Sequence, residues 1–429
     1  MTDTVSRPPH TAVTSLAFQK LLIGIMFLSF LMFTQRDVGT VVEGGLDRTR
    51  IARGVVLALI WFLVILRSIA TRHYRWVKEV ISRPLCAFGV YVGWAAISIL
   101  YSGDRILSAA KVFELSTDLL TIAFIYGATI GAGAWEDIWK FTMKCLVGLI
   151  VSYVAITVVS GRQLVDLVGV FPIWVGFGGR NGLTQIGAIV GLFALSRFFG
   201  VPAQRVKYFF LLSFCCVVML VSYSRASIFI FAMLAAVIML KYRKSALLLV
   251  VGAGAAILLT AAGEQVMAYF LRGQTQETFF LLTGRVDVIW AGALFLILQS
   301  PILGYGYYYG TTHLAPLAIY GRYDVPFTNV DNTFLEVTLN LGAIGLGVFA
   351  FIWLMAGRTL LAYRHALSAF SRTLLFWECA LIVVSTFIRS WVNPTIAYHH
   401  WNTVVFWIAM GALAQGVANV DHPREDIPR

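Results

Sequence analysis

Residues 141–159 read FTMKCLVGLIVSYVAITVV, an apolar run in which Lys144 is the single charged residue. A helix needs about 20 predominantly apolar residues to cross the hydrocarbon core of a bilayer, somewhat fewer or more with tilt. This run therefore predicts a membrane-spanning helix. Similar runs recur along nearly the whole chain, so the same argument predicts an all-α, polytopic membrane protein.

The composition excludes a soluble domain. Of the 429 residues, 59% are hydrophobic and 13% are charged, whereas soluble proteins have about 45–50% apolar and about 25% charged residues. The cysteines lie within or beside apolar runs without metal-ligand spacing, so we interpret them as small packing residues. They are Cys86, Cys145, Cys215, Cys216 and Cys379.

About twelve transmembrane helices are predicted, and together they form a single integral membrane domain over residues 1–429. The first apolar run lacks an obvious small-residue cleavage site, which favours a retained helix over a signal peptide. The predicted spans are 21–33, 55–69, 85–101, 119–130, 141–159, 183–199, 209–221, 228–240, 246–261, 334–355, 374–387 and 404–414.

The net charge of +12 is interpreted as topological. Basic residues collect in cytoplasmic loops of membrane proteins, and a cytoplasmic N-terminus places most basic clusters on that side. Both termini are then cytoplasmic, and nucleic acid is not expected as a partner. The first outer loop opposes the bias, because it holds Arg36, Arg48, Arg50 and Arg53. The cytoplasmic clusters are Arg72 to Arg83, Arg197 to Lys207, Lys241 to Lys244 and Arg358 to Arg372.

This topology puts residues 161–180, 222–227 and 262–331 on the outer face. The last segment is too polar to span the membrane, and loops this long are usually functional or disordered. Its aromatic content argues against disorder. Within it, residues 286–299 carry apolar residues at helical spacing, which predicts an amphipathic helix along the membrane surface or over the bundle. We expect 262–331 to be an extracytoplasmic loop that covers an active site.

Two arginines on the outer face are candidates for binding an anion. Arg225 lies in VSYSRA (221–226), between two apolar runs with almost no loop, where a charge is costly unless it faces a partner or a wet cavity. It either reaches to the lipid headgroups or binds a phosphate through its planar guanidinium. Arg285 in LTGRVD (282–287) is either a surface residue paired with Asp287 or a second clamp on a diphosphate.

Acidic and histidine side chains form the second group of candidates. Asp331 stands where the outer segment enters a predicted span, and it is either an N-cap or a general base that takes a proton from a hydroxyl. Glu336 follows about one turn later, and an acid within the membrane is usually functional. His313 and the pair His399-His400 also fall outside. No carboxylate or cysteine completes a metal-binding spacing around them, so no metal is expected.

Several segments, taken together and in order, are similar to the bacterial O-antigen ligase and polysaccharide polymerase superfamily. Exopolysaccharide polymerases are the nearest branch, and the resemblance covers about residues 100–350. The segments that carry it are YSGDR (101–105), FGGRN (177–181), SR (224–225), TGR (283–285) with Trp290, PILGYG (301–306), NTFLE (332–336) and LGAIG (341–345).

The resemblance implies a metal-independent glycosyltransferase of the bacterial cytoplasmic (inner) membrane that needs no cofactor. Its donor would be a glycan linked to a polyprenyl (undecaprenyl) diphosphate, used on the extracytoplasmic face. Arg225 and Arg285 would hold the diphosphate leaving group and Asp331 would act on the acceptor hydroxyl. The residues expected to bind substrate are Arg180, Asn181, Asn332, Glu336 and His313.

The sequence departs from the family pattern at one important position. The family usually has a histidine before Asn332, and this chain has Asp331; a carboxylate is a weaker base than an imidazole. His313 is a possible substitute. Arg180 keeps the charge of the lysine that is common there.

Three functions remain open from the sequence. A repeat-unit polymerase is the first choice, and a ligase that transfers glycan to a lipid or protein acceptor is the second. For either enzyme, export and chain-length proteins of polysaccharide synthesis are further possible partners. The third function is a transporter or flippase for a lipid-linked or anionic solute. A transporter needs charge along a path through the membrane, whereas the predicted spans carry little beyond Asp118, Glu336 and Arg389, which favours an enzyme.

Overall fold

The computed structural model of the chain describes most of the helical segments. Residues 262, 265, 268–284 and 319–329 fall outside the described part, so the prediction that the segment 262–331 covers a site stays a prediction. The described residues are 10–31, 48–71, 74–81, 84–129, 132–161, 165–168, 171–174, 180–222, 224–261, 263–264, 266–267, 285–318, 330–370, 374–393 and 395–421.

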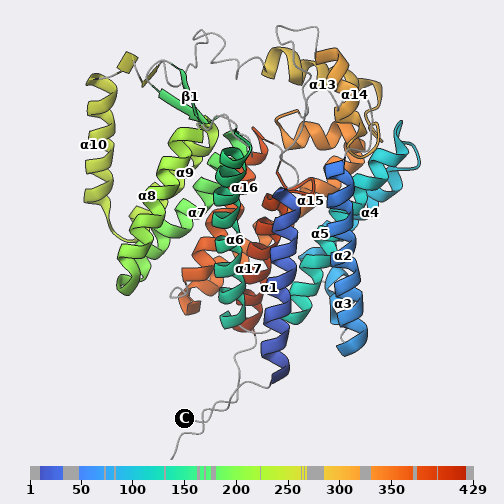
Figure 1. The fold of residues 1–429 in the computed structure, drawn as a ribbon, viewed down its shortest axis with the longest axis horizontal. Helices are drawn as coiled ribbons and strands as arrows, with labels where there is room; N and C mark the ends of the chain where they lie inside the picture. Colours follow the sequence, from blue (N-terminus) through green and yellow to red (C-terminus); the bar gives the residue numbers. More distant parts are fainter. Residues whose placement is uncertain are drawn as a thin grey trace, which may run out of the picture.

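Within those ranges the fold is all-α except for one small hairpin (Figure 1). Strands β1 (Val165–Val168) and β2 (Phe171–Trp174) pair antiparallel, with Val165 opposite Trp174. The hairpin, α13 and α14 lie at the same end of the bundle. The helices are α1 (His10–Leu31), α2 (Arg48–Thr71), α3 (Arg75–Ile81), α4 (Leu85–Ser98), α5 (Arg105–Ala128), α6 (Ala132–Val159), α7 (Arg180–Gly200), α8 (Arg205–Ser222), α9 (Arg225–Lys241), α10 (Ser245–Ala261), α13 (Ala291–Gln299), α14 (Tyr309–Ala318), α15 (Thr333–Phe370), α16 (Leu374–Ser390) and α17 (Trp401–Asp421).

Five helices of the described part are long and apolar enough to cross a membrane. Four shorter apolar helices accompany them. The polytopic membrane class is therefore confirmed, and the count of twelve spans stays a prediction. The five are Ile51–Thr71, Ala134–Val159, Asn181–Gly200, Pro202–Ser222 and Thr333–Ala362; the shorter ones are Leu16–Leu31, Leu85–Ser98, Ser245–Gly254 and Trp401–Ala414.

Two helices extend beyond the apolar runs that predicted them. Helix α5 begins at Arg105, so Asp118 lies in the middle of the helix and not near its end. Helix α2 begins at Arg48, so the prediction that Arg53 belongs to an outer loop is wrong. Arg53 is buried and forms an ion pair with Glu114 of α5. A paired charge can lie inside a helix bundle, which hydropathy alone does not reveal.

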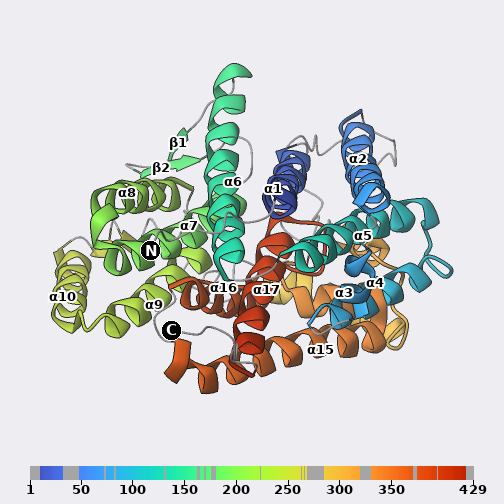
Figure 2. The same ribbon diagram turned by 90° about the horizontal axis from the view of Figure 1, so that it is seen from below.

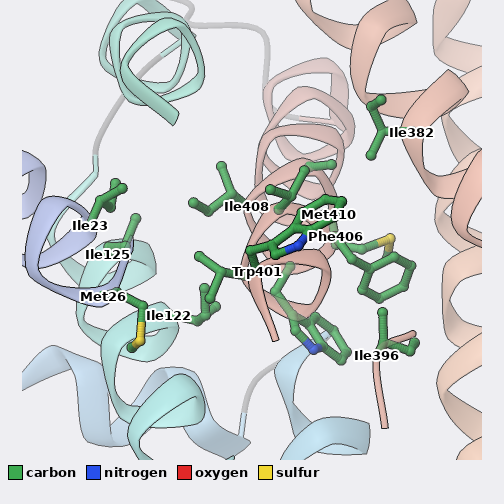
Figure 3. Close-up of a cluster of buried hydrophobic side chains, with 14 of the residues drawn as sticks. Ile23, Met26, Ile122, Ile125, Ile382, Ile396, Trp401, Phe406, Ile408 and Met410 are labelled. Atoms are coloured by element: carbon green, nitrogen blue, oxygen red, sulfur yellow. The ribbon is translucent and has the colours of Figure 1, made fainter. Parts of the chain in front are cut away.

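The core is centred on α17, which α1, α5, α6, α15 and α16 surround (Figure 2). Side chains from different helices converge there, among them Met26 of α1, Ile122 and Ile125 of α5, and Ile408 of α17 (Figure 3). Because lipid tails are as apolar as these side chains, close van der Waals packing between the helices holds this core together. Outward-facing apolar residues such as Phe62 remain exposed, as a lipid-facing surface requires.

Helix α15 is broken near its start, and a neighbouring loop satisfies the break. Gly342 has a φ of 66°, and a side chain there would collide with the carbonyl oxygen of Ile302. The carbonyl oxygens of Leu339 and Asn340 accept backbone hydrogen bonds from residues 301–306, at 3.2 and 2.8 Å. Irregular backbone is tolerated at membrane depth only when its polar groups find such partners. The PILGYG segment therefore has a structural role beside α15.

Candidate functional site

Arg225 lies at the first residue of α9, directly after the end of α8. The residue before it, Ser224, is extended, and its backbone N–H donates to Thr184 Oγ1 of α7 at 3.1 Å. Ser227, in the first turn of α9, donates to the Ser224 hydroxyl at 3.2 Å. Arg225 is partly buried. A cationic side chain at the positive end of a helix dipole is a suitable place for an anion.

The start of α15 is capped by Asn332 and not by Asp331. The Asn332 side-chain oxygen accepts from the backbone N–H groups of Phe334 and Leu335, at 3.0 and 3.1 Å. The interpretation of Asp331 as an N-cap is therefore wrong. Asp331 is partly buried and lies one residue earlier, with a left-handed backbone (φ 54°), which aspartate tolerates better than most residues. Its carboxylate is thus not needed as the helix cap.

A loop after α16 ties the start of α15 to the end of α16. The Thr333 hydroxyl donates to the Asn393 carbonyl at 2.8 Å and accepts from the Thr395 backbone N–H at 3.1 Å. The hydroxyls of Thr395 and Ser390 are 2.6 Å apart. Ser390 is the last residue of α16 and follows Arg389 directly. Thr333, two residues after Asp331, is therefore linked through Thr395 to Ser390.

Arg389 completes the connection to α9. Its Nη2 donates to the Ser227 hydroxyl at 2.8 Å, two residues after Arg225. A continuous set of contacts therefore runs from the start of α15, beside Asp331, through the end of α16 to the start of α9. In the sequence, Arg389 stands out only as a charge within a predicted span. Its contact with Ser227, 162 residues away, has no local signal in the sequence.

The helical turn that begins at Arg285 lies beside Asp331. This π-helical turn, Arg285–Trp290, precedes α13, so the predicted amphipathic helix over 286–299 is confirmed as helical. Trp290 Nε1 donates to the carbonyl of Val330 at 3.0 Å, and Ile289 packs in one apolar cluster with Val330. The backbone thus places Arg285 near the segment that carries Asp331. The Arg285 side chain lies outside the described residues.

Asn181 and Arg180 start α7, near the start of α9. Asn181 is exposed, and Thr184, three residues later, is the acceptor for Ser224. The Arg180 side chain and residues 175–179 lie outside the described part of the chain. The first residues of α7 and α9 are therefore neighbours, as a shared binding site requires.

Glu336 and His313 lie where α14 packs against α15. Glu336 is buried and accepts a hydrogen bond from the Thr311 hydroxyl at 3.3 Å. Thr311 and Asn340 hydrogen-bond each other, which packs α14 against α15. His313 is exposed, and its ring lies against the rings of Tyr305 and Tyr309. Glu336 also interacts electrostatically with Asp331, so this contact adjoins the start of α15.

The histidine pair has structural partners. His399 Nδ1 lies 2.8 Å from Asp118 Oδ1, and its Nε2 lies 3.3 Å from the Ser29 hydroxyl. His400 Nδ1 accepts from the Asn402 backbone N–H at 3.3 Å. Burial, and after it the charge of Arg389, lowers the pKa of His400 to about 4. Among the residues that the structure describes, no three potential ligands gather into a metal-binding group.

A second buried arginine lies toward the other end of α16. Arg197, predicted as part of a cytoplasmic loop, is buried in the last turn of α7 and bonds Glu378 through Nε at 2.7 Å and Nη2 at 3.0 Å. Its Nη1 donates to Glu136 at 2.9 Å. Glu378 and Arg389 are 11 residues apart, about 16 Å along the helix. The charged groups at the two ends of α16 are thus separate.

This geometry is that of a multi-pass membrane protein in which hydrogen bonds link the start of α9, the end of α16 and the start of α15. Residues 208–350 match the family described as O-antigen ligase, which confirms the superfamily that the sequence motifs resemble. The matched segment runs from α8 into α15 and contains Arg225, Arg285 and Asp331. No curated protein matches the chain. The family supports a membrane enzyme of the glycan ligase or polymerase type, with a lipid-linked glycan donor and an acceptor.

Proposed function

We propose that this chain is a glycosyltransferase that polymerises polyprenyl-diphosphate-linked repeat units on the extracytoplasmic face of the inner membrane. The observation that supports it is the set of contacts that runs from Ser227, two residues after Arg225, through the end of α16 to Thr333, two residues after Asp331. This arrangement offers a cation for a leaving group and a carboxylate base for an incoming hydroxyl. Both termini would be cytoplasmic.

The chemistry is a displacement at the anomeric carbon of the donor sugar. The acceptor hydroxyl oxygen forms the new bond while its proton passes to the Asp331 carboxylate. The bond to the diphosphate breaks, and the electron pair leaves on the diphosphate. Arg225, with Arg285 from the neighbouring turn, stabilises that charge as it develops. Asn181 and Arg180 at the start of α7 would contact the donor.

The two carboxylates of the region have different roles in this proposal. Asp331 is partly buried at the head of α15 and is the proposed base. Glu336 accepts from Thr311 in the contact between α14 and α15, where it would position the acceptor side of the site. The exposed His313 on α14 would contact the acceptor glycan. Segment 262–331 would exclude water, which otherwise hydrolyses the donor.

Ligation to a lipid or protein acceptor is the second candidate. The family description, O-antigen ligase, favours it, whereas the sequence motifs are nearer to exopolysaccharide polymerases. Both reactions use the same donor and leaving group, so the arginine assignments serve either one. They differ in what accumulates when the enzyme fails.

The test is glycan chain length in cells that carry Arg225→Ala, Arg285→Ala or Asp331→Asn. Arg205→Ala is the matched control, because Arg205 is an exposed arginine at the opposite end of α8. Protein levels in the membrane are measured for every variant. We expect loss of long polymer with accumulation of single lipid-linked repeat units, and a normal pattern for Arg205→Ala.

Other outcomes would change the conclusion. Accumulation of full-length, unattached lipid-linked polymer would identify a ligase. An unchanged polysaccharide in all three variants would overturn the arginine clamp and favour a transporter of a lipid-linked or anionic solute.

A further inference from the structure

Arg389 is a buried arginine that lacks a carboxylate partner among the described residues. Only 1% of the residue is exposed. Its Nη2 donates to the Ser227 hydroxyl at 2.8 Å, and its Nε and Nη1 have no hydrogen-bond partner in the part of the chain that the structure describes. A buried, uncompensated charge costs several kcal/mol. Its position at the candidate site suggests a use for that charge.

The same chain shows how a structural arginine is neutralised. Arg197 is 4% exposed, and each of its three nitrogen atoms bonds a carboxylate oxygen, from Glu378 or Glu136. Arg389 is at least as buried, but Ser227 supplies only a neutral hydroxyl. Arg389 lies in the last turn of α16, where the partial negative charge of the helix end stabilises a cation. That partial charge and one neutral hydroxyl neutralise Arg389 less completely than two carboxylates neutralise Arg197.

The start of α9 adds to this positive charge. The helix has 17 residues, and its N-cap residue Ser224 makes no side-chain cap hydrogen bond. The positive end of its dipole therefore lies at the turn that contains Ser227, whose hydroxyl accepts from Arg389. His400, which senses the charge of Arg389, has a pKa of about 4, so it is neutral at physiological pH and neither adds to nor cancels this charge.

We propose that Arg389 is the buried counter-charge of the site. It holds the first turn of α9 in place through Ser227 and supplies a fixed positive potential for the diphosphate of the lipid donor at Arg225. This inference rests on the proposed function, because that function supplies the diphosphate. Arg389 acts through Ser227 and through its field, so it is a positioning residue that does not touch the substrate.

The test measures binding of two probes to the purified full-length protein in detergent. Farnesyl diphosphate carries the anionic group, and farnesol carries the same chain without it. For Arg389→Gln we expect about tenfold weaker binding of farnesyl diphosphate, the effect of losing one nearby charge, and unchanged binding of farnesol. Arg389→Lys keeps the charge and should stay within about threefold of the wild type. Arg205→Gln is the control for an exposed charge.

A variant that is less stable does not leave the question open. Ser227→Ala removes the hydrogen bond but keeps the buried charge, and we expect about threefold weaker binding of farnesyl diphosphate with unchanged binding of farnesol. Monodisperse elution and the farnesol affinity report on folding. If Arg389→Gln does not fold, the affinities of Arg389→Lys and Ser227→Ala test the inference instead. An equal loss of affinity for farnesyl diphosphate and for farnesol in these variants overturns it.

The outcomes separate this inference from the proposed function. If Arg225→Gln weakens farnesyl diphosphate binding and Arg389→Gln does not, the role of Arg389 is wrong and the proposed function stands. If Arg389→Gln weakens both probes equally, Arg389 is only a packing residue and the inference is overturned. If neither variant changes diphosphate binding, the arginine site itself fails, and with it both proposals.

Discussion

The ion pair between Arg197 and Glu378 offers a sharp test of how the bundle is held together. Glu378 is 2% exposed and accepts from Arg197 Nε at 2.7 Å, from Arg197 Nη2 at 3.0 Å and from Trp139 Nε1 at 3.0 Å. Glu378→Gln keeps the shape of the side chain and removes its charge. It leaves Arg197 with one carboxylate, Glu136, whose side chain is 39% exposed.

The expected loss of unfolding free energy depends on the partner that Arg197 keeps. Removing one partner of a buried ion pair costs about 3–5 kcal/mol, because the other charge stays buried without compensation. Since Glu136 still pairs with Arg197, we expect the lower end, about 3 kcal/mol. Replacing both partners, in Arg197→Met with Glu378→Leu, removes the uncompensated charge and should restore at least half of the loss.

The assay is denaturant unfolding of the purified protein in detergent, followed by tryptophan fluorescence. The coupling energy is the change in unfolding free energy of the double substitution minus the sum of the changes for Arg197→Met and Glu378→Leu made singly. A loss below about 1 kcal/mol for Glu378→Gln, or strictly additive effects, would refute the reasoning that this pair locks α7 to α16. A matched control is Lys20→Gln, since its ion pair with Asp137 is long, 4.0 Å, and joins side chains that are 33% and 51% exposed.

Three further predictions address other parts of the molecule. Gly342→Ala should abolish folded protein in the membrane, measured by fluorescence-detected chromatography, because Cβ would collide with the Ile302 carbonyl; a normal elution profile would contradict this. Trp290→Phe should lower the free energy of unfolding by about 1 kcal/mol, measured by denaturant titration, through its lost hydrogen bond to Val330; an unchanged value would contradict that contact. Stability should fall as pH drops from about 6.5 to about 4, because the unfolded chain protonates a histidine that the folded chain keeps neutral; His400→Gln should flatten this slope in thermal melts across that range, and an unaltered slope would count against it.

The sequence predicted best those features that local patterns determine. Long apolar runs predicted the helices that cross the membrane, because a span must satisfy its backbone internally. Arg225 was found because two runs leave almost no loop around it, which puts it at the start of α9. The helical segment after Arg285 followed from its spacing of apolar residues.

Pairwise contacts between distant residues were not predictable from one sequence. Arg197 and Glu378 are 181 residues apart. Hydropathy registers each of them only as a charged residue that lowers the mean hydropathy of its own apolar run. Asp331 and Asn332 are both good cap residues, so only the backbone conformation decides which of them caps α15. The break at Gly342 lies within an apolar stretch that reads as one helix.

The measurement that tests the central claim most directly counts products from a defined donor. The purified protein is reconstituted in vesicles with a polyprenyl-diphosphate-linked repeat unit and a metal chelator, and glycosidic bonds and released polyprenyl diphosphate are quantified. We expect one polyprenyl diphosphate for each new bond in the wild type, and loss of both in Arg225→Gln. Donor that crosses the bilayer without any new bond, or bond formation undiminished in Arg225→Gln, would contradict the account.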